Sequence, residues 1–131
     1  MSGRGGAALG HNFRRMLIYD RAVQLATEVY ALTRRLPGDE AFGLTSQLRR
    51  AALSVVLNIA EGSGASSSRE FVRFLEIARR SVYEVEAGLD VGGRLRLLMD
   101  DHCRDVTAHA DELAAMISGF RSRLSRRGDS R

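Results

Sequence analysis

The sequence predicts an all-α protein, an antiparallel up-down four-helix bundle. Apolar residues recur in steps of three and four over four separate stretches, whereas no stretch alternates in the way a half-buried strand does. The single proline, Pro37, and the run Gly62-Ser63-Gly64 fall between stretches, where they end helices and leave short linkers. A chain of 131 residues makes about one domain. We predict the bundle over residues 17–124, a flexible basic arm over 1–16 and a flexible basic tail over 125–131.

The first helix is predicted from about Leu17 to Pro37-Gly38, which cannot continue it. Its apolar stripe consists of Ala22, Leu25, Val29, Leu32 and Leu36. In the linker that follows, Asp39 is placed to cap a single turn, and Thr45 or a neighbour is expected to cap the second helix.

The second helix, predicted to run to about Glu61, is small and apolar on almost every side. Its apolar residues are Ala51, Ala52, Leu53, Val55, Val56, Leu57, Ile59 and Ala60. A helix that is apolar nearly all round belongs inside an assembly, so we expect it to form the centre of the bundle.

A row of polar residues nevertheless follows one side of this second helix. An unpaired buried donor or acceptor costs about 1–3 kcal/mol, so polar groups buried there need partners on the neighbouring helix. We predict a structural polar core made of Gln47, Ser54, Asn58, Glu61, Ser81 and Glu84. The alternative, an acid–base group of Asn58, Glu61 and Glu84, is less favoured, because such residues usually fix how helices align.

The third helix is predicted to begin with a capping box from Ser67 to Glu70. Its stripe consists of Phe71, Leu75, Ala78, Val82, Val85 and Leu89. We place the break before the fourth helix near Met99-Asp100, because acids there meet the positive end of a helix dipole. The fourth stripe consists of Val106, Ala110, Leu113, Ile117, Phe120 and Leu124, and we expect fraying from Arg126 onward.

The sequence carries no pattern typical of an enzyme, a cofactor site or a metal site. His102 and His109 lie two helical turns apart, too far to share one ion, and Cys103 is expected to be a small apolar filler. With a single cysteine there is no internal disulfide, which fits a reducing cytoplasm. The longest apolar run is far shorter than the ~20 residues that a membrane span needs. We therefore predict a cytoplasmic protein that is neither an enzyme nor membrane-spanning.

Positive charge is concentrated at the two ends of the sequence. The net charge is +4, and all 20 basic residues are arginines, whose planar groups suit phosphate and carboxylate. Residues 1–16 hold three arginines and no acid, and residues 119–131 hold five arginines and one aspartate. Residues 17–118 hold 12 arginines and 15 acids. Basic ends of this kind bind nucleic acid in many proteins and are passive in others.

Four motifs carry a resemblance to a known family. They are P-x-x-E at Pro37–Glu40, L-T-S-Q-L-R-R-A-A at Leu44–Ala52, S-V-V-L-N-I-A-E-G at Ser54–Gly62, and F-x-x-F-L-x-I-A-R-x-S-x-x-E at Phe71–Glu84. Together they closely resemble the bacterial four-helix-bundle proteins encoded in intervening sequences of 23S rRNA genes, the S23-type proteins. The resemblance covers about residues 17–124. That family is similar to the accessory variability determinant proteins of diversity-generating retroelements.

The resemblance implies a homopentameric ring of four-helix bundles that binds nucleic acid without known catalysis. Our first hypothesis is therefore an oligomer that binds RNA or DNA, with structured RNA or rRNA as the expected ligand. The candidate contact residues are Arg14, Arg15, Arg49, Arg50, Arg121, Arg123, Arg126 and Arg127. If the basic ends prove passive, Arg73 is a further candidate on the bundle itself, beside Arg49 and Arg50. The second hypothesis is a structural adaptor without nucleic-acid binding, whose partner is a protein such as a reverse transcriptase.

Overall fold

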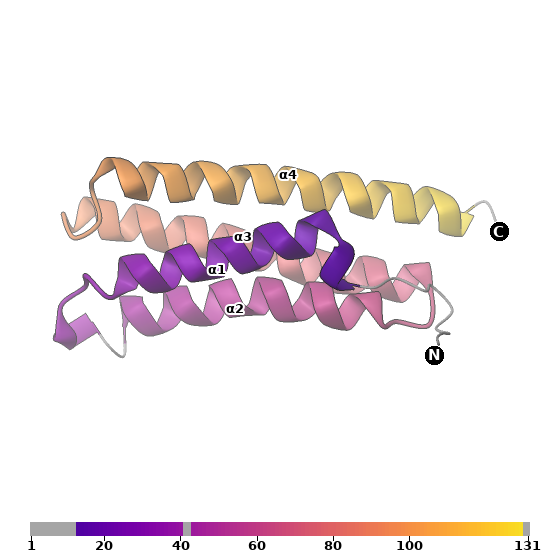
Figure 1. The fold of residues 1–131 in the computed structure, drawn as a ribbon, viewed down its shortest axis with the longest axis horizontal. Coiled ribbons are helices and arrows are strands. Elements are labelled where there is room, and N and C mark those ends of the chain that lie inside the picture. The colour runs from indigo at the N-terminus through magenta and orange to yellow at the C-terminus, as the bar shows by residue number, and fades with distance from the viewer. Residues whose placement is uncertain (1–12, 41–42, 130–131) are drawn as a thin grey trace.

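The structure, a computed structural model, describes residues 13–40 and 43–129. Four long helices follow one another: α1 (Leu17–Thr33), α2 (Leu44–Ser63), α3 (Ser68–Arg94) and α4 (Asp101–Asp129). Two short 3-10 turns precede α1 and α2: η1 (Phe13–Arg15) and η2 (Gly38–Glu40). The helices run side by side in alternating directions (Figure 1), which confirms the predicted all-α bundle. Within the described ranges, none of the helices has the length and hydropathy needed to cross a membrane.

The helices occupy the four corners of the bundle, and none of them lies at its centre. α2 packs against α1 and α3, and α4 packs against the same two helices. Among the described residues, α2 and α4 face each other diagonally without direct backbone contact. The prediction that α2 forms the centre is therefore wrong. Its apolar outer face is turned to solvent instead, with the Leu57 side chain 60% exposed.

The core is made from the apolar stripes that the periodicity predicts. Val29 and Leu32 of α1, Leu75 of α3 and Leu113 of α4 are all at most 1% exposed. α2 contributes mainly small side chains, and these let its backbone approach α3 closely. A Cβ added to Gly62 would lie 2.7 Å from the Cβ of Phe74, which is closer than packed side chains tolerate.

The beginnings of α3 and α2 are stabilised in different ways. The Ser67 hydroxyl accepts a hydrogen bond from the Glu70 amide at 3.1 Å, as the capping box predicts. The Glu70 carboxylate accepts in return from the Ser66 amide at 3.2 Å, one residue before the cap. At the start of α2 the Glu40 carboxylate accepts from the Leu44 amide at 3.1 Å. Thr45 lies inside the helix, so the side chain that caps α2 is that of Glu40 and not that of Thr45.

The fourth helix is longer than the sequence suggests. α4 continues without a break to Asp129, so the predicted flexible tail over residues 125–131 is wrong as far as residue 129. At the other end of the chain, residues 13–15 form η1, which packs against α1 and α2. The remainder of the predicted arm, residues 1–12, lies outside the described residues, as do residues 130 and 131.

Candidate nucleic-acid interface

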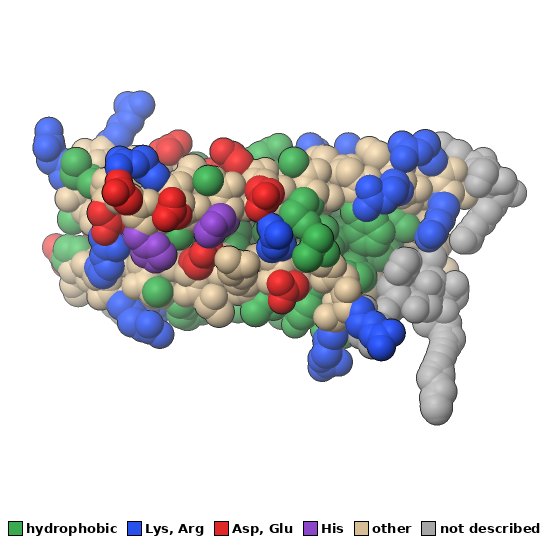
Figure 2. Space-filling view, turned by 45° about the horizontal axis from the view of Figure 1, so that its top comes forward, with side chains coloured by type: hydrophobic (Ala, Val, Ile, Leu, Met, Phe, Trp, Pro, Cys, Tyr) green, Lys and Arg blue, Asp and Glu red, His purple; other side chains and the backbone are tan. Residues whose placement is uncertain are grey.

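The antiparallel arrangement brings both basic segments of the chain to one end of the bundle. α1 begins and α4 ends at this end (Figure 1), and basic side chains lie around it, as they also do around the opposite end (Figure 2). It carries six of the eight arginines predicted as contacts. These are Arg14 and Arg15 of η1 and Arg121, Arg123, Arg126 and Arg127 of α4. We call this region the basic end.

Two further arginines join the basic end from the first turns of α3. Arg69 and Arg73 are exposed one turn apart, and Arg80 continues their row two turns further along the helix. These side chains line a shallow depression of about 360 Å³, together with Val72, Glu76 and Ile77. Arg69 and Arg80 were not among the predicted contacts, and the sequence favoured a solvated or ion-paired face for Arg80. The sequence did hold a signal for these two arginines. Their positions lie opposite the apolar stripe of the third helix, which places them on the outer face of α3.

Aromatic rings hold two arginines at the basic end. The Arg14 guanidinium lies 4.8 Å from the centre of the Phe13 ring, and the Arg123 guanidinium lies 5.7 Å from that of Phe120. The Phe13 ring in turn meets the Tyr19 ring edge to face at 4.9 Å. A cation–π contact of this kind restrains a guanidinium over the face of a ring.

One arginine of the basic end is held in place by an ion pair with an acidic residue. Arg121 forms an ion pair with Glu76 of α3, and both side chains are about one-third exposed. This pair links α4 to α3 beside the aromatic contact between Phe71 and Phe120, whose ring centres lie 5.4 Å apart. Arg121 therefore has a clear structural role at this end.

Arg49 and Arg50 do not belong to the basic end, because they lie near the start of α2, at the opposite end of the bundle. Arg49 donates through Nε to the Thr33 hydroxyl at 2.8 Å and lies 4.6 Å over the Tyr30 ring. It therefore joins α2 to α1. Arg50 is exposed and donates to the side-chain oxygen of Gln47 at 2.7 Å.

The predicted polar core is smaller than expected. The hydroxyl oxygens of Ser54 and Ser81 lie 2.8 Å apart across the α2–α3 seam, and Ser81 is only 4% exposed. Asn58 donates to the Ser54 carbonyl at 2.8 Å and to the Ser54 hydroxyl at 3.0 Å, so it reaches Ser81 only through Ser54.

The other three predicted members of the polar core are exposed: Gln47, Glu61 and Glu84. Their assignment to the core of the bundle is a mistake, because they lie on the outer side of the seam, where water can solvate them. Beside them on the outer face of α2, Leu53 is 41% exposed in addition to Leu57. We call the surface formed by Leu53 and Leu57 the α2 apolar face.

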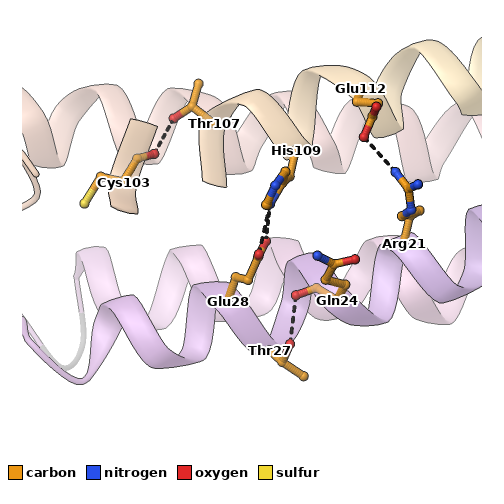
Figure 3. A network of polar contacts seen from close by, with 8 residues as sticks. All are labelled: Arg21, Gln24, Thr27, Glu28, Cys103, Thr107, His109 and Glu112. Atoms are coloured by element: carbon orange, nitrogen blue, oxygen red, sulfur yellow. Dashed lines mark hydrogen bonds and ion pairs between the residues drawn. The ribbon is translucent and has the colours of Figure 1, made fainter. Parts of the chain in front are cut away.

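Two polar pairs join α1 to α4 along their seam (Figure 3). His109 Nδ1 lies 2.9 Å from both carboxylate oxygens of Glu28, and Arg21 donates to Glu112 at 2.7 Å. Cys103 is buried. Over the described part of the chain, no three His, Cys, Asp or Glu side chains are grouped closely enough to hold a metal ion.

The carboxyl group of Glu86 has a strongly raised pKa. Glu86 of α3 lies against Asp111 of α4, and its pKa is raised to about 7, first of all by burial. A hydrogen bond with Asp111 and the negative charges of Asp111 and Asp90 contribute to this rise, because they disfavour a second anion beside them. This group lies away from the basic end and makes the α3–α4 seam sensitive to pH.

Comparisons with known proteins agree with the motifs and the fold. The 23S rRNA-intervening sequence protein family model matches residues 14–119. A crystal structure from Bacteroides thetaiotaomicron, of a protein of unknown function from the S23 ribosomal protein family, is similar with a TM-score of 0.75. The two chains are 21% identical over 80% of this chain and 98% of that one, which shows likeness of fold. A search of the curated proteins finds no match. The chain belongs to the 23S rRNA-intervening sequence protein family.

Proposed function

We propose that this protein is a non-enzymatic, oligomeric nucleic-acid-binding bundle that contacts RNA or DNA phosphates through its basic end. The observation that carries the proposal is the meeting of both basic chain segments at one end of the bundle. Separated along the sequence, three arginines at one terminus and five at the other are weak signals. The six of them that the structure describes lie at the same end of the bundle as Arg69 and Arg73 of α3, and together they form a source of positive potential.

The distribution of charge along the bundle supports contact at this end in particular. Residues 17–118 hold more acids than arginines, and Arg21 in the α1–α4 seam is neutralised by its ion pair with Glu112. A polyanion would therefore be attracted to the basic end and held less well along the body. Such contacts to phosphates carry little sequence preference.

Oligomerisation would strengthen these contacts. The α2 apolar face exposes Leu53 and Leu57 next to each other on one helix, and adjacent exposed leucines of this kind mark interaction surfaces. We propose that this face packs against another copy of the chain, and the family resemblance favours a ring of five. Each copy would add its own basic end, so that individually weak phosphate contacts act together through avidity.

The decisive experiment is a salt series of RNA binding with two charge-matched double variants. Arg123→Gln/Arg126→Gln removes two arginines from the basic end, and Arg34→Gln/Arg94→Gln removes two exposed arginines from the opposite end. If the first pair contacts two phosphates of a single strand, its loss reduces the slope of log K against log[salt] by about 1.4. The second double variant should retain the wild-type slope. Equal slopes for both variants would show that the basic end is passive.

The second candidate function is a structural adaptor that binds protein instead of nucleic acid. The α2 apolar face is the observation that favours it, because two exposed leucines one turn apart on a helix suit a protein partner whether or not RNA is bound. Retention of a reverse transcriptase or another protein partner through this face, with no RNA binding at any salt concentration, would support the adaptor.

A further inference from the structure

A groove at the basic end separates the first turn of α1 from the C-terminal half of α4. Its volume is about 580 Å³, within the range of about 300–1,000 Å³ that is usual for small-ligand sites. Most of its lining is apolar: Met16, Leu17, Ile18, Ala115, Met116, Gly119 and Phe120. Figure 2 shows an exposed apolar area toward this end of the bundle. We call this feature the α1–α4 groove.

Among the residues that the structure describes, two charged side chains line the groove, Glu112 and Arg123, and they differ in what they offer a ligand. The Glu112 carboxylate is already paired with Arg21 at 2.7 Å. The Arg123 guanidinium lies over the Phe120 ring at 5.7 Å and presents a flat cationic surface beside an aromatic one. The groove therefore favours a flat, partly apolar group that stacks on π surfaces and on guanidinium planes.

Arginines lie close in sequence to the lining residues of both α1 and α4. Arg14 and Arg15 directly precede Met16 in the chain, and Arg126 and Arg127 follow Arg123 within about one helical turn. A flat group inside the groove would thus have cationic side chains on either flank. A nucleotide strand has this pattern, because each base lies between two phosphates of its backbone.

We propose that the α1–α4 groove accepts one unstacked nucleobase of a single strand, so that the basic end prefers single-stranded RNA or DNA to duplex. This inference rests on the proposed function and adds a ligand class to it. Single-strand binders combine a positively charged track with surfaces on which bases stack. In a duplex the bases are paired and stacked inside the helix, so they can offer only phosphates to this surface.

The shape of the groove depends on Gly119. A Cβ added there would meet only Arg123 Nη1, at 3.7 Å, so a side chain can enter the open space without a clash in the core. Gly119→Leu would fill part of the groove and leave every arginine in place. Replacing glycine inside a helix also favours the helical state, so the variant should remain folded.

The test measures dissociation constants for a short fluorescent single strand and for a blunt-ended RNA duplex with the same number of phosphates. A third probe is the single strand with its bases replaced by abasic spacers. We expect the wild type to bind the single strand at least about ten times more tightly than either other probe, a ratio typical of one stacked base. Gly119→Leu should reduce that ratio toward one and leave duplex binding unchanged.

Two other variants complete the experiment. Ala87→Leu adds a leucine to the exposed outer face of α3, away from the groove, and should retain the wild-type preference. Leu17→Ser removes an apolar side chain that lines the groove but is 58% exposed, so it should lower the preference without unfolding the bundle.

The possible outcomes separate this inference from the proposed function. Equal wild-type affinity for the single strand and the duplex would overturn the groove assignment and leave phosphate binding standing. An undiminished preference in both Gly119→Leu and Leu17→Ser would also overturn it. Failure of every probe to bind at low salt would instead overturn the proposed function itself.

Discussion

Ser54 and Ser81 join α2 to α3 through hydroxyl oxygens 2.8 Å apart, and Asn58 donates to the same Ser54 hydroxyl at 3.0 Å. This short chain of hydrogen bonds is the polar part of a seam that is otherwise closely packed. Ser81 is buried, whereas Ser54 and Asn58 are half-buried. The group therefore lies where the seam opens toward the surface of the bundle.

We predict that Asn58→Leu lowers both the melting temperature and the order of the assembly. The substitution removes the donor to Ser54, and a lost hydrogen bond of this kind costs about 1 kcal/mol. It also places a branched apolar side chain beside the α2 apolar face. Thermal melting and light scattering measure the two effects, with Ala87→Leu at an exposed position of α3 as the control. Unchanged melting and mass would contradict the prediction.

The α2 apolar face yields a prediction about mass in solution. We expect the wild type to be larger than the 14.4 kDa chain at micromolar concentration, because Leu53 and Leu57 would pack against a second copy. Leu53→Gln/Leu57→Gln should reduce the mass to that of one chain. Val91→Gln replaces a residue that is 50% exposed on another part of the surface and should leave the mass unchanged. A monomeric wild type would count against the proposed oligomer.

Gly62 provides a test of the contact between α2 and α3. A Cβ at this position would lie 2.7 Å from the Phe74 Cβ and 2.8 Å from Phe71 Cδ1. Forcing atoms into a packed seam costs about 1–3 kcal/mol, so Gly62→Ala should lower the free energy of unfolding by that amount. Gly38→Ala is the matched control, because nothing lies within 4 Å of its added Cβ. Urea denaturation of the two variants gives the comparison.

Glu86 makes part of the stability depend on pH. Its pKa is raised from 4.5 to about 7 in the folded protein, so folding favours the protonated carboxyl. This contribution is fully present below pH 4.5 and is lost as the pH rises through 7. Glu86→Gln mimics the protonated form, so its stability relative to the wild type should increase over this interval. Urea midpoints at several pH values would show the trend, and Glu84→Gln, at an exposed position, should not reproduce it.

The sequence predicted most of the helical framework, because local spacing determines which face of a helix is apolar. Val29, Leu32, Leu75 and Leu113 are buried as their periodicity requires. The capping hydrogen bond between Ser67 and the Glu70 amide is likewise a local pattern. What spacing does not show is which neighbouring helix covers a given face.

Because spacing does not show which helix covers a face, the prediction of the polar core was partly wrong. Gln47, Glu61 and Glu84 have the spacing of a shared face, yet only Ser54 and Ser81 meet across the seam. The hydrogen bond between Arg49 and Thr33 is also a tertiary contact. It gives Arg49, which was predicted to contact nucleic acid, a role in joining α2 to α1. The basic end was only partly predictable, because the gathering of Arg69 with the arginines of α4 requires the fold.

The continuation of α4 to Asp129 changes how its arginines meet a ligand. On a helix, Arg123 and Arg127 are separated by a fixed rise of about 6 Å, whereas on a flexible segment their distance would fluctuate. A preorganised row of cations loses little conformational entropy when a polyanion arrives. Proline substitution at Ser122 would disrupt this rod without removing a single charge, and would thereby distinguish the effect of rigidity from that of charge.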